Sequence, residues 1–202
     1  MAEEVVIVGA GGHGRVCLDV CLLTNTPVRG FVDGGREVGE IIHGVSVLGG
    51  DELLSNHGFR ADAHFIVGIG NRHIRHRVIA ELDRNGAALA TLIHPSAVVS
   101  PRSEIGAGTL VNAGAVINIG ARIGRHCVLN TSCSVDHDCT LGDGCQICPG
   151  ATLAGGVTCA PGAFIGSGSV VLPNRTIGKR AIIGAGSSVA NDVPDGVTIA
   201  NR

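Results

Sequence analysis

The sequence between residues 93 and 193 repeats with a period of six. Of the seventeen residues at every sixth position, sixteen are Ile, Leu or Val, and the exception is Cys159. A helix would repeat with a period near 3.6 and a single strand with a period of 2, so neither explains the pattern. A hexapeptide repeat does, and it predicts a parallel β-helix in which each short strand buries one aliphatic side chain. The series is Ile93, Val99, Ile105, Val111, Ile117, Ile123, Leu129, Val135, Leu141, Ile147, Leu153, Cys159, Ile165, Val171, Ile177, Ile183 and Val189.

Small side chains predominate four residues after each of these positions, where the corners of such a coil need them. Four of the eight cysteines fall in this second series, which predicts buried, reduced thiols and argues against disulfides or a metal site. An interior of this kind has no room for aromatic rings, which fits a chain with 32 Gly, no Trp, no Tyr and only 4 Phe. The four cysteines are Cys127, Cys133, Cys139 and Cys145.

Charge and hydropathy exclude several classes of protein. The net charge is −2 with acids and bases interspersed, so no basic stripe for nucleic acid is expected. The first residues are acidic, unlike a signal peptide, and no apolar run approaches the roughly 20 residues of a membrane span. We therefore expect a cytoplasmic protein that does not insert into membranes.

The N-terminal stretch has the pattern of a nucleotide-binding turn. An apolar run over residues 5–8 leads into a G-x-G-x-x-G segment at residues 9–14, followed by a predicted helix over 15–23 and a strand over 28–32. Asp33 ends that strand about 20 residues after the glycines, where an acid that binds ribose is expected. The backbone N–H groups of the turn and the start of the helix would face a diphosphate.

The residues that follow complete only one half of a dinucleotide fold. We expect an edge strand over residues 44–48, a short helix capped by Asp51 and running to residue 56, a strand over 64–69, a helix over 71–85 and a strand over 88–93. Since a full dinucleotide site needs two such halves, a mononucleotide diphosphate is favoured over NAD, with a docking domain that binds no ligand as the alternative. The buried face of the second helix is predicted to hold Ile74, Val78, Ile79 and Leu82.

The sequence therefore predicts two domains. Residues 1–92 form an α/β, Rossmann-like half-domain that binds a nucleotide sugar, and residues 93–202 form the β-helix.

Two histidines, His126 and His137, lie in the repeat beyond the His94-Pro95 junction. His126 precedes a corner cysteine and is expected to point to solvent. His137 lies between Asp136 and Asp138, and a histidine beside a carboxylate is suited to act as a general base near neutral pH. A zinc-dependent anhydrase needs three histidines around the metal, so that alternative is rejected and no metal is expected.

Three segments carry a resemblance to a known family: residues 11–14, 68–71 and 130–139. Together with the hexapeptide coil, they resemble the sugar N- and O-acetyltransferases of the hexapeptide-repeat family, which include sialic-acid O-acetyltransferase-like proteins and enzymes that acetylate a UDP-4-amino-sugar. The resemblance covers nearly the full length. It implies a left-handed β-helix, acetyl-CoA as donor, and a homotrimer with active sites between neighbouring subunits.

The resemblance also assigns roles to individual residues. His137 matches the family's catalytic base, and Asp138 stands where the family has a glutamate that polarises it, with Asp136 as a possible substitute. The residues that match nucleotide-sugar contacts are Gly12, His13, Gly14, Asp33 and Gly70. The residues that match acetyl-CoA contacts are Gln146, which replaces a histidine, Ser167 and Ala185. The C-terminal segment, residues 197–202, lacks the Gly-Val-Pro-Ala-type tail common in the family.

The function implied is transfer of an acetyl group from acetyl-CoA to the amino group of a nucleotide-linked amino sugar, in glycan biosynthesis. The amine would attack the thioester directly while His137 takes its proton. Two alternatives stay open: O-acetylation of a sialic acid or another sugar hydroxyl, and a scaffold without catalysis that binds a nucleotide sugar. UDP is favoured as the nucleotide by resemblance alone.

Overall fold

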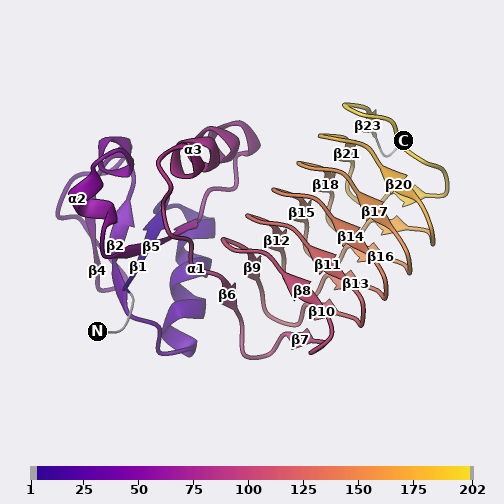
Figure 1. Ribbon diagram of the computed structural model, residues 1–202, viewed down its shortest axis with the longest axis horizontal. Helices are drawn as coiled ribbons and strands as arrows, with labels where there is room; N and C mark the ends of the chain where they lie inside the picture. Colours follow the sequence, from indigo (N-terminus) through magenta and orange to yellow (C-terminus); the bar gives the residue numbers. More distant parts are fainter. Residues whose placement is uncertain (1–3, 201–202) are drawn as a thin grey trace. The chain divides into compact units, whose positions relative to one another are not determined.

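A computed structural model describes residues 4–200, and the chain divides into two compact units between Leu92 and Ile93 (Figure 1). The two ends discussed above, residues 1–3 and 201–202, lie outside the described residues. Each unit is described by itself. Within residues 4–200, no helix is long and apolar enough to cross a membrane.

The first unit is built on a five-stranded sheet with the order β3-β4-β2-β1-β5. β4, β2, β1 and β5 run parallel, and β3 pairs antiparallel with β4 at one edge. Residues of β1, β2 and β5 are almost entirely buried, as expected for short apolar strands in a parallel sheet. The strands are β1 (Glu4–Val8), β2 (Val28–Val32), β3 (Ile41–Ile42), β4 (Val45–Gly49) and β5 (Ala63–Val67).

The helices of this unit are α1 (Gly12–Leu23), the 3₁₀ helix η1 (Asp51–Leu54), α2 (His57–Arg60) and α3 (Arg72–Arg84). The cap predicted at Asp51 is wrong, because Gly50 precedes η1 and makes no side-chain cap bond. Asn56 instead caps the short α2, accepting a hydrogen bond from the Phe59 N–H at 3.0 Å. Asn71 caps α3 in the same way through the Ile74 N–H at 3.1 Å.

The buried face of α3 differs from the prediction at one position. Val78 and Leu82 are buried as expected, whereas Ile74 is 43% exposed. Arg75 is buried in its place, and its guanidinium donates to the carbonyl of Val67 at the end of β5. Ile74 belongs to the first turn of α3, where it lines a cavity and does not pack into the core.

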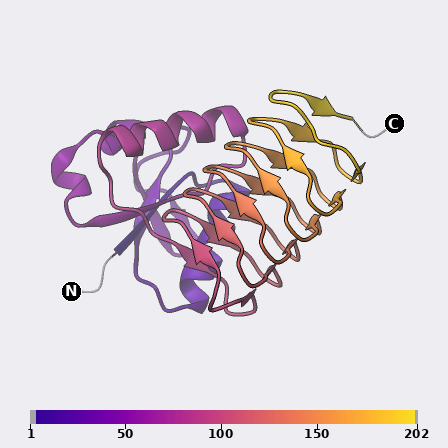
Figure 2. The ribbon, with the colours of Figure 1, turned by 45° about the vertical axis from the view of Figure 1, so that its right-hand side comes forward.

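The second unit is a left-handed parallel β-helix of three sheets, here called faces 1, 2 and 3, which confirms the fold predicted from the repeat. Successive strands of a face are 18 residues apart, as in Val116↔Ser134 and Ile117↔Val135, except at the C-terminal end, where Ile182 pairs with Thr198. Figure 2 shows the coils stacking one upon the next. The chain visits the faces in turn, so each corner joins two successive faces.

Face 1 consists of β6 (Leu92–Ile93), β9 (Leu110–Val111), β12 (Val128–Leu129), β15 (Gln146–Ile147), β18 (Phe164–Ile165), β21 (Ile182–Ile183) and β23 (Thr198–Ile199). Face 2 consists of β7 (Val98–Val99), β10 (Val116–Ile117), β13 (Ser134–Val135), β16 (Thr152–Leu153), β19 (Val170–Val171) and β22 (Ser188–Val189). Face 3 consists of β8 (Glu104–Ile105), β11 (Arg122–Ile123), β14 (Thr140–Leu141), β17 (Thr158–Cys159) and β20 (Thr176–Ile177).

The interior of the coil follows the six-residue phase. From Val111 onward the predicted aliphatic residues are buried, and the four corner cysteines are at most 1% exposed. All eight cysteines of the chain are free thiols. Ile93 is 38% exposed, and Val99 and Ile105 are only partly buried, because these residues belong to the first coil, which has another coil on one side only. The strand predicted over residues 88–93 is likewise reduced to Leu92–Ile93, with Leu89 forming only an isolated bridge to Phe65.

Candidate active site

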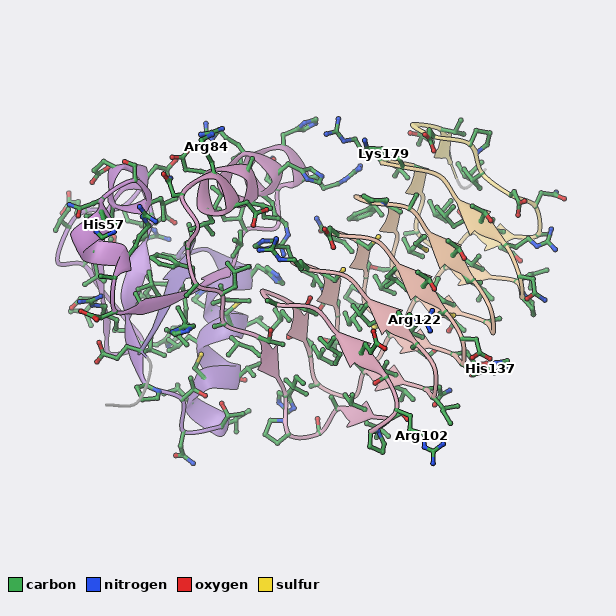
Figure 3. All side chains as sticks on the ribbon, in the orientation of Figure 1. His57, Arg84, Arg102, Arg122, His137 and Lys179 are labelled. Carbon is green, nitrogen blue, oxygen red and sulfur yellow. The ribbon has the colours of Figure 1, made fainter. Side chains whose placement is uncertain are left out.

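His137 lies in the turn between β13 and β14, at the corner that joins faces 2 and 3. Its side chain is 58% exposed, and Figure 3 shows it at the outer edge of the coil. The next residue, Asp138, has a φ of +59°. Left-handed backbone disfavours most side chains but is tolerated by short polar ones such as Asp. The turn therefore presents a histidine and a carboxylate together at the surface.

The imidazole of His137 is hydrogen bonded to Asp138 and not to Asp136. His137 Nδ1 lies 2.9 Å from Asp138 Oδ2, so the shorter aspartate reaches the ring. Asp136 Oδ1 instead accepts from the backbone N–H of His137 at 2.8 Å and from Asn118 Nδ2 at 2.8 Å. One carboxylate therefore orients the ring while the other fixes the backbone that carries it.

Both carboxylates influence protonation of the ring. The hydrogen bond that His137 makes to the carboxylate of Asp138 raises the pKa of His137, and the charge of Asp136 adds to this. The hydrogen bond from Asn118 holds the pKa of Asp136 below its usual range, helped by the bond from the His137 backbone, so Asp136 stays charged. When Nδ1 donates to Asp138, Nε2 keeps a lone pair and can accept a proton. The pair is arranged as a general base with a carboxylate partner.

The two cysteines that flank His137 most closely in the sequence, Cys133 and Cys139, are not suited to be nucleophiles. Burial raises the pKa of the Cys133 thiol to about 12 and also raises that of Cys139. A buried thiol with a raised pKa is not ionised near neutral pH, and the thiolate is the reactive form.

The prediction that His126 points to solvent is wrong, because this residue is only 1% exposed. The repeat phase tells which residues point into the coil. It does not report what packs against a residue that points outward.

A cavity of about 470 Å³ lies in the first unit at the carboxyl ends of β1 and β2. In the order of the sheet, β2 and β4 lie on one side of β1, and β5 lies on the other side. In open α/β sheets, ligands bind at the carboxyl ends of the strands where the order reverses in this way. The cavity is lined by Val8, Gly9, Val32, Asp33, Gly34, Gly35, Asp51, Ile69, Ile74 and Arg77.

Asp33 is the one predicted nucleotide-sugar residue that lines this cavity. Its carboxylate accepts hydrogen bonds from the backbone N–H groups of Ala10 at 2.8 Å and Gly35 at 2.9 Å. It therefore holds the glycine turn against the end of β2. Arg77 Nη2 donates to Asp51 Oδ2 at 3.1 Å, both residues line the same cavity, and neither was predicted from the sequence to belong to the site. The rule that polar residues at carboxyl strand ends line ligand sites could have pointed to Asp51, which follows β4 by two residues.

The other four predicted nucleotide-sugar residues lie outside the lining of that cavity. Gly14 has a packing role, since a Cβ there would lie 1.8 Å from the Gly9 carbonyl oxygen. Gly12 lines a separate cavity of about 410 Å³ along α1, and Gly70 is exposed in the turn after β5. His13 is half-buried, and burial together with the charge of Arg75 lowers its pKa to about 4, so it is neutral at physiological pH.

The predicted acetyl-CoA residues lie apart from His137 within one chain. Gln146 lies on β15 of face 1 and is largely buried, while Ser167 and Ala185 are exposed at the corner between faces 1 and 2. Ser167 and Ala185 are 18 residues apart, so they occupy the same place on successive coils. His137 is at the other edge of face 2, at the corner opposite face 1. Among residues 4–200, no group of three or more His, Cys, Asp or Glu could hold a metal ion.

Two family descriptions match the chain: the PglD N-terminal domain over residues 4–82 and the bacterial transferase hexapeptide (six repeats) over residues 120–155. The structure is similar to the acetyltransferase domain of PglB from Neisseria gonorrhoeae FA1090, with 34% identity, 98% of this chain and 97% of that chain covered, and a TM-score of 0.92. It is also similar to PerB from Caulobacter crescentus in complex with CoA and GDP-perosamine, with 38% identity, coverage of 98% and 94%, and a TM-score of 0.90.

A curated relative is the UDP-N-acetylbacillosamine N-acetyltransferase of Bacillus subtilis (strain 168), 36% identical over 120 residues. That match covers 55% of this chain and spans about half the relative's length, 52%.

Proposed function

Because the chain belongs to the hexapeptide-repeat acetyltransferases that carry a PglD N-terminal domain, we propose that it transfers an acetyl group from acetyl-CoA to the amino group of a nucleotide-linked amino sugar. The two solved relatives include a complex with CoA and a GDP-linked sugar, and the curated relative is named for a UDP-linked product. The domain that ends at residue 92 would bind the nucleotide sugar, and the coil would bind acetyl-CoA and carry out the transfer.

The observation that supports this most strongly is the hydrogen bond between His137 and Asp138. The sugar amine attacks the thioester carbonyl, and His137 Nε2 takes the proton as the new C–N bond forms. The C–S bond then breaks, and the imidazolium returns the proton to the departing CoA sulfur. General-base catalysis of this kind is worth about 10²- to 10⁴-fold in rate. A backbone N–H of the coil would stabilise the oxyanion during the attack.

For the nucleotide we propose the cavity at the carboxyl ends of β1 and β2. The glycine turn at its wall offers backbone N–H groups, and Arg77 offers a cation for a diphosphate. Asp33 is available to a ribose hydroxyl while it holds the turn. His13, which is neutral, can donate or accept a hydrogen bond, and Gly12, Gly14 and Gly70 shape the backbone around it.

We also propose that the active enzyme is a homotrimer with its sites between subunits. Gln146, Ser167 and Ala185 cannot meet His137 in one chain, because a whole face of the coil separates them. A second copy placed against face 2 would bring the two sets together. Apolar side chains that are exposed on face 2 and its corner support such a contact: Val98 at 63%, Ile119 at 52%, and Val170 and Leu172 at 39% each. The eight free thiols fit the reducing cytoplasm, which we propose as its compartment.

The proposal is tested by incubating the protein with acetyl-CoA and a panel of UDP-, GDP-, CMP- and dTDP-linked amino sugars, with release of the CoA thiol as the readout. We expect thiol release only with an acceptor that carries a free amine on a nucleotide-linked sugar. Thiol release with a sialic acid hydroxyl as the sole acceptor would mean that the protein catalyses O-acetylation and not N-acetylation. Binding of a nucleotide sugar without any release would leave a scaffold that has no catalytic role.

A further inference from the structure

The turn that carries His137 recurs at the same corner in every coil. Its second residue, read every 18 positions, is Pro101, Ile119, His137, Gly155 and Pro173. The coils are in register at this corner, since Asp138 N–H donates to Ile119 O at 3.1 Å and Gly156 N–H donates to His137 O at 2.9 Å. Gly155 is thus the residue directly beside His137 on the next coil, and the one position in the column without a side chain.

The backbone does not require glycine at residue 155. Its φ is outside the left-handed region, unlike that of Gly156, which follows it at +70°. Proline, isoleucine and histidine all occupy the equivalent position on other coils. The missing side chain therefore has another cause.

The neighbour of Gly155 is the imidazole itself. A Cβ on Gly155 would lie 2.5 Å from His137 Nε2, 2.6 Å from Cε1 and 3.2 Å from Cδ2, and these are the three nearest heavy atoms. Contacts below about 3.0 Å are not found for real Cβ atoms, so the ring would have to move. The ring lies in the space that the absent side chain leaves.

The other half of the pair is accommodated in the same way. Gly120 lies one coil earlier, and a Cβ there would lie 2.5 Å from Asp138 Oδ1. The histidine and its carboxylate are thus bracketed by glycines on the two neighbouring coils. Because φ at Gly120 is +75°, a substitution there would also strain the backbone, which makes Gly155 the cleaner position to test.

We propose that Gly155 is a positioning residue, whose lack of a side chain leaves room for the Nε2–Cε1 edge of the His137 ring while Nδ1 stays bonded to Asp138. The inference rests on the proposed function, because ring placement matters for activity only if His137 is the base.

Gly155→Ala tests the inference through kinetics. Displacement of a catalytic group by about 1 Å can cost 10²-fold in rate. We expect kcat to fall by about 10²-fold while KM for the nucleotide sugar stays within about twofold, since the nucleotide cavity is in the other unit.

A second readout is the pKa of His137, followed by NMR titration of the ring. A ring moved away from Asp138 loses the hydrogen bond that raises its pKa, so in Gly155→Ala the value should fall toward the ordinary value of about 6.5. A residue needed only for folding would leave this pKa unchanged.

Two controls separate ring placement from damage to the coil. Gly142→Ala introduces a similar clash, 2.7 Å from the Pro161 ring, at a different corner, and should lower Tm while kcat stays within about twofold. His137→Ala/Gly155→Ala should match His137→Ala in both activity and Tm, because without the ring the extra methyl has room.

The inference is overturned if Gly155→Ala keeps kcat within about twofold of the parent, or if it lowers Tm equally in the His137→Ala background. These outcomes are distinct from failure of the proposed function. A fully active His137→Ala variant would contradict both the proposed function and the role of Gly155. An inactive His137→Ala variant together with an active Gly155→Ala variant would contradict only the role of Gly155.

Discussion

At the scale of single residues, the bond between His137 Nδ1 and Asp138 Oδ2 sets how the site responds to pH. In the proposed mechanism the base must be neutral to accept a proton, so we expect activity to fall as pH drops through the pKa of His137. Because Asp138 raises that pKa, it makes the ring a stronger base and moves the acid limb of the pH–rate profile to higher pH.

Asp138→Asn should therefore move the acid limb of kcat/KM to lower pH, since loss of the carboxylate lowers the pKa of His137. The plateau rate should also fall, by about 10- to 100-fold, because the amide no longer stabilises the imidazolium. The pH–rate profile of purified protein measures both effects. Asp136→Asn serves as the comparison and should shift the limb less, since Asp136 bonds the backbone of His137 and not its ring. An unchanged limb in Asp138→Asn would rule out this role for the carboxylate.

His13 gives a second pH effect, on stability. Its pKa is about 4 in the folded chain, from burial and then Arg75, against about 6.5 when unfolded. The unfolded chain therefore takes up the proton first, so this contribution is complete above about pH 6.5 and is lost as pH falls toward 4. Between pH 7.5 and 5 the loss should be about 2 kcal/mol. Urea unfolding of the parent and His13→Asn at both pH values measures it, and an identical pH dependence in the two proteins would contradict the assignment.

At the scale of elements, α3 contributes side chains both to the core of the first unit and to the proposed nucleotide cavity. Leu82 and Val78 are buried in the core, whereas Ile74 is exposed and lines the cavity that we propose for the nucleotide. The same helical stripe thus begins at this cavity and ends in the core.

Leu82→Ala should lower the free energy of unfolding by about 2 to 5 kcal/mol, because it leaves a cavity in the core. Ile74→Ala should change that free energy by less than about 0.5 kcal/mol but raise KM for the nucleotide sugar by about threefold to tenfold. Denaturant unfolding and steady-state kinetics on the two variants check this division. Equal destabilisation by both changes would place Ile74 in the core after all.

Each sequence pattern could predict only the structural features that it encodes directly. The six-residue period gave the coil and its buried cysteines, because phase alone decides which residues point inward. It could not show that His126, which lies outside the aliphatic series, is buried, or that Ile93 in the first coil is partly exposed. The pair of His137 and Asp138 could be found because the residues adjoin in sequence. Asp51 and Arg77 meet only through the packing of α3 beside the sheet edge, and Gly155 reaches His137 only through the 18-residue register.

At the scale of the whole molecule, a single coil places His137 and the residues proposed to bind acetyl-CoA at different edges of the β-helix. The proposed trimer joins His137 of one subunit to Gln146, Ser167 and Ala185 of another, so the subunits should complement each other.

Subunit mixing tests this arrangement. His137→Ala and Ala185→Trp should each be inactive alone, the first without its base and the second with a blocked acetyl-CoA surface. Random mixing of equal amounts by co-expression should restore about a quarter of the parent activity per site, the fraction of sites at which His137 of one subunit and Ala185 of the other are both unchanged. Mixing His137→Ala with His137→Asn is the matched control and should restore nothing. A co-expressed pair without activity would place the whole site in one chain.

The most direct measurement is the steady-state rate of acetyl transfer by His137→Ala, with the nucleotide amino sugar that the parent protein uses. We predict that kcat falls by about 10²- to 10⁴-fold while KM for the nucleotide sugar stays within about twofold. A variant that keeps more than about half of the parent kcat would contradict the assignment of His137 as the base.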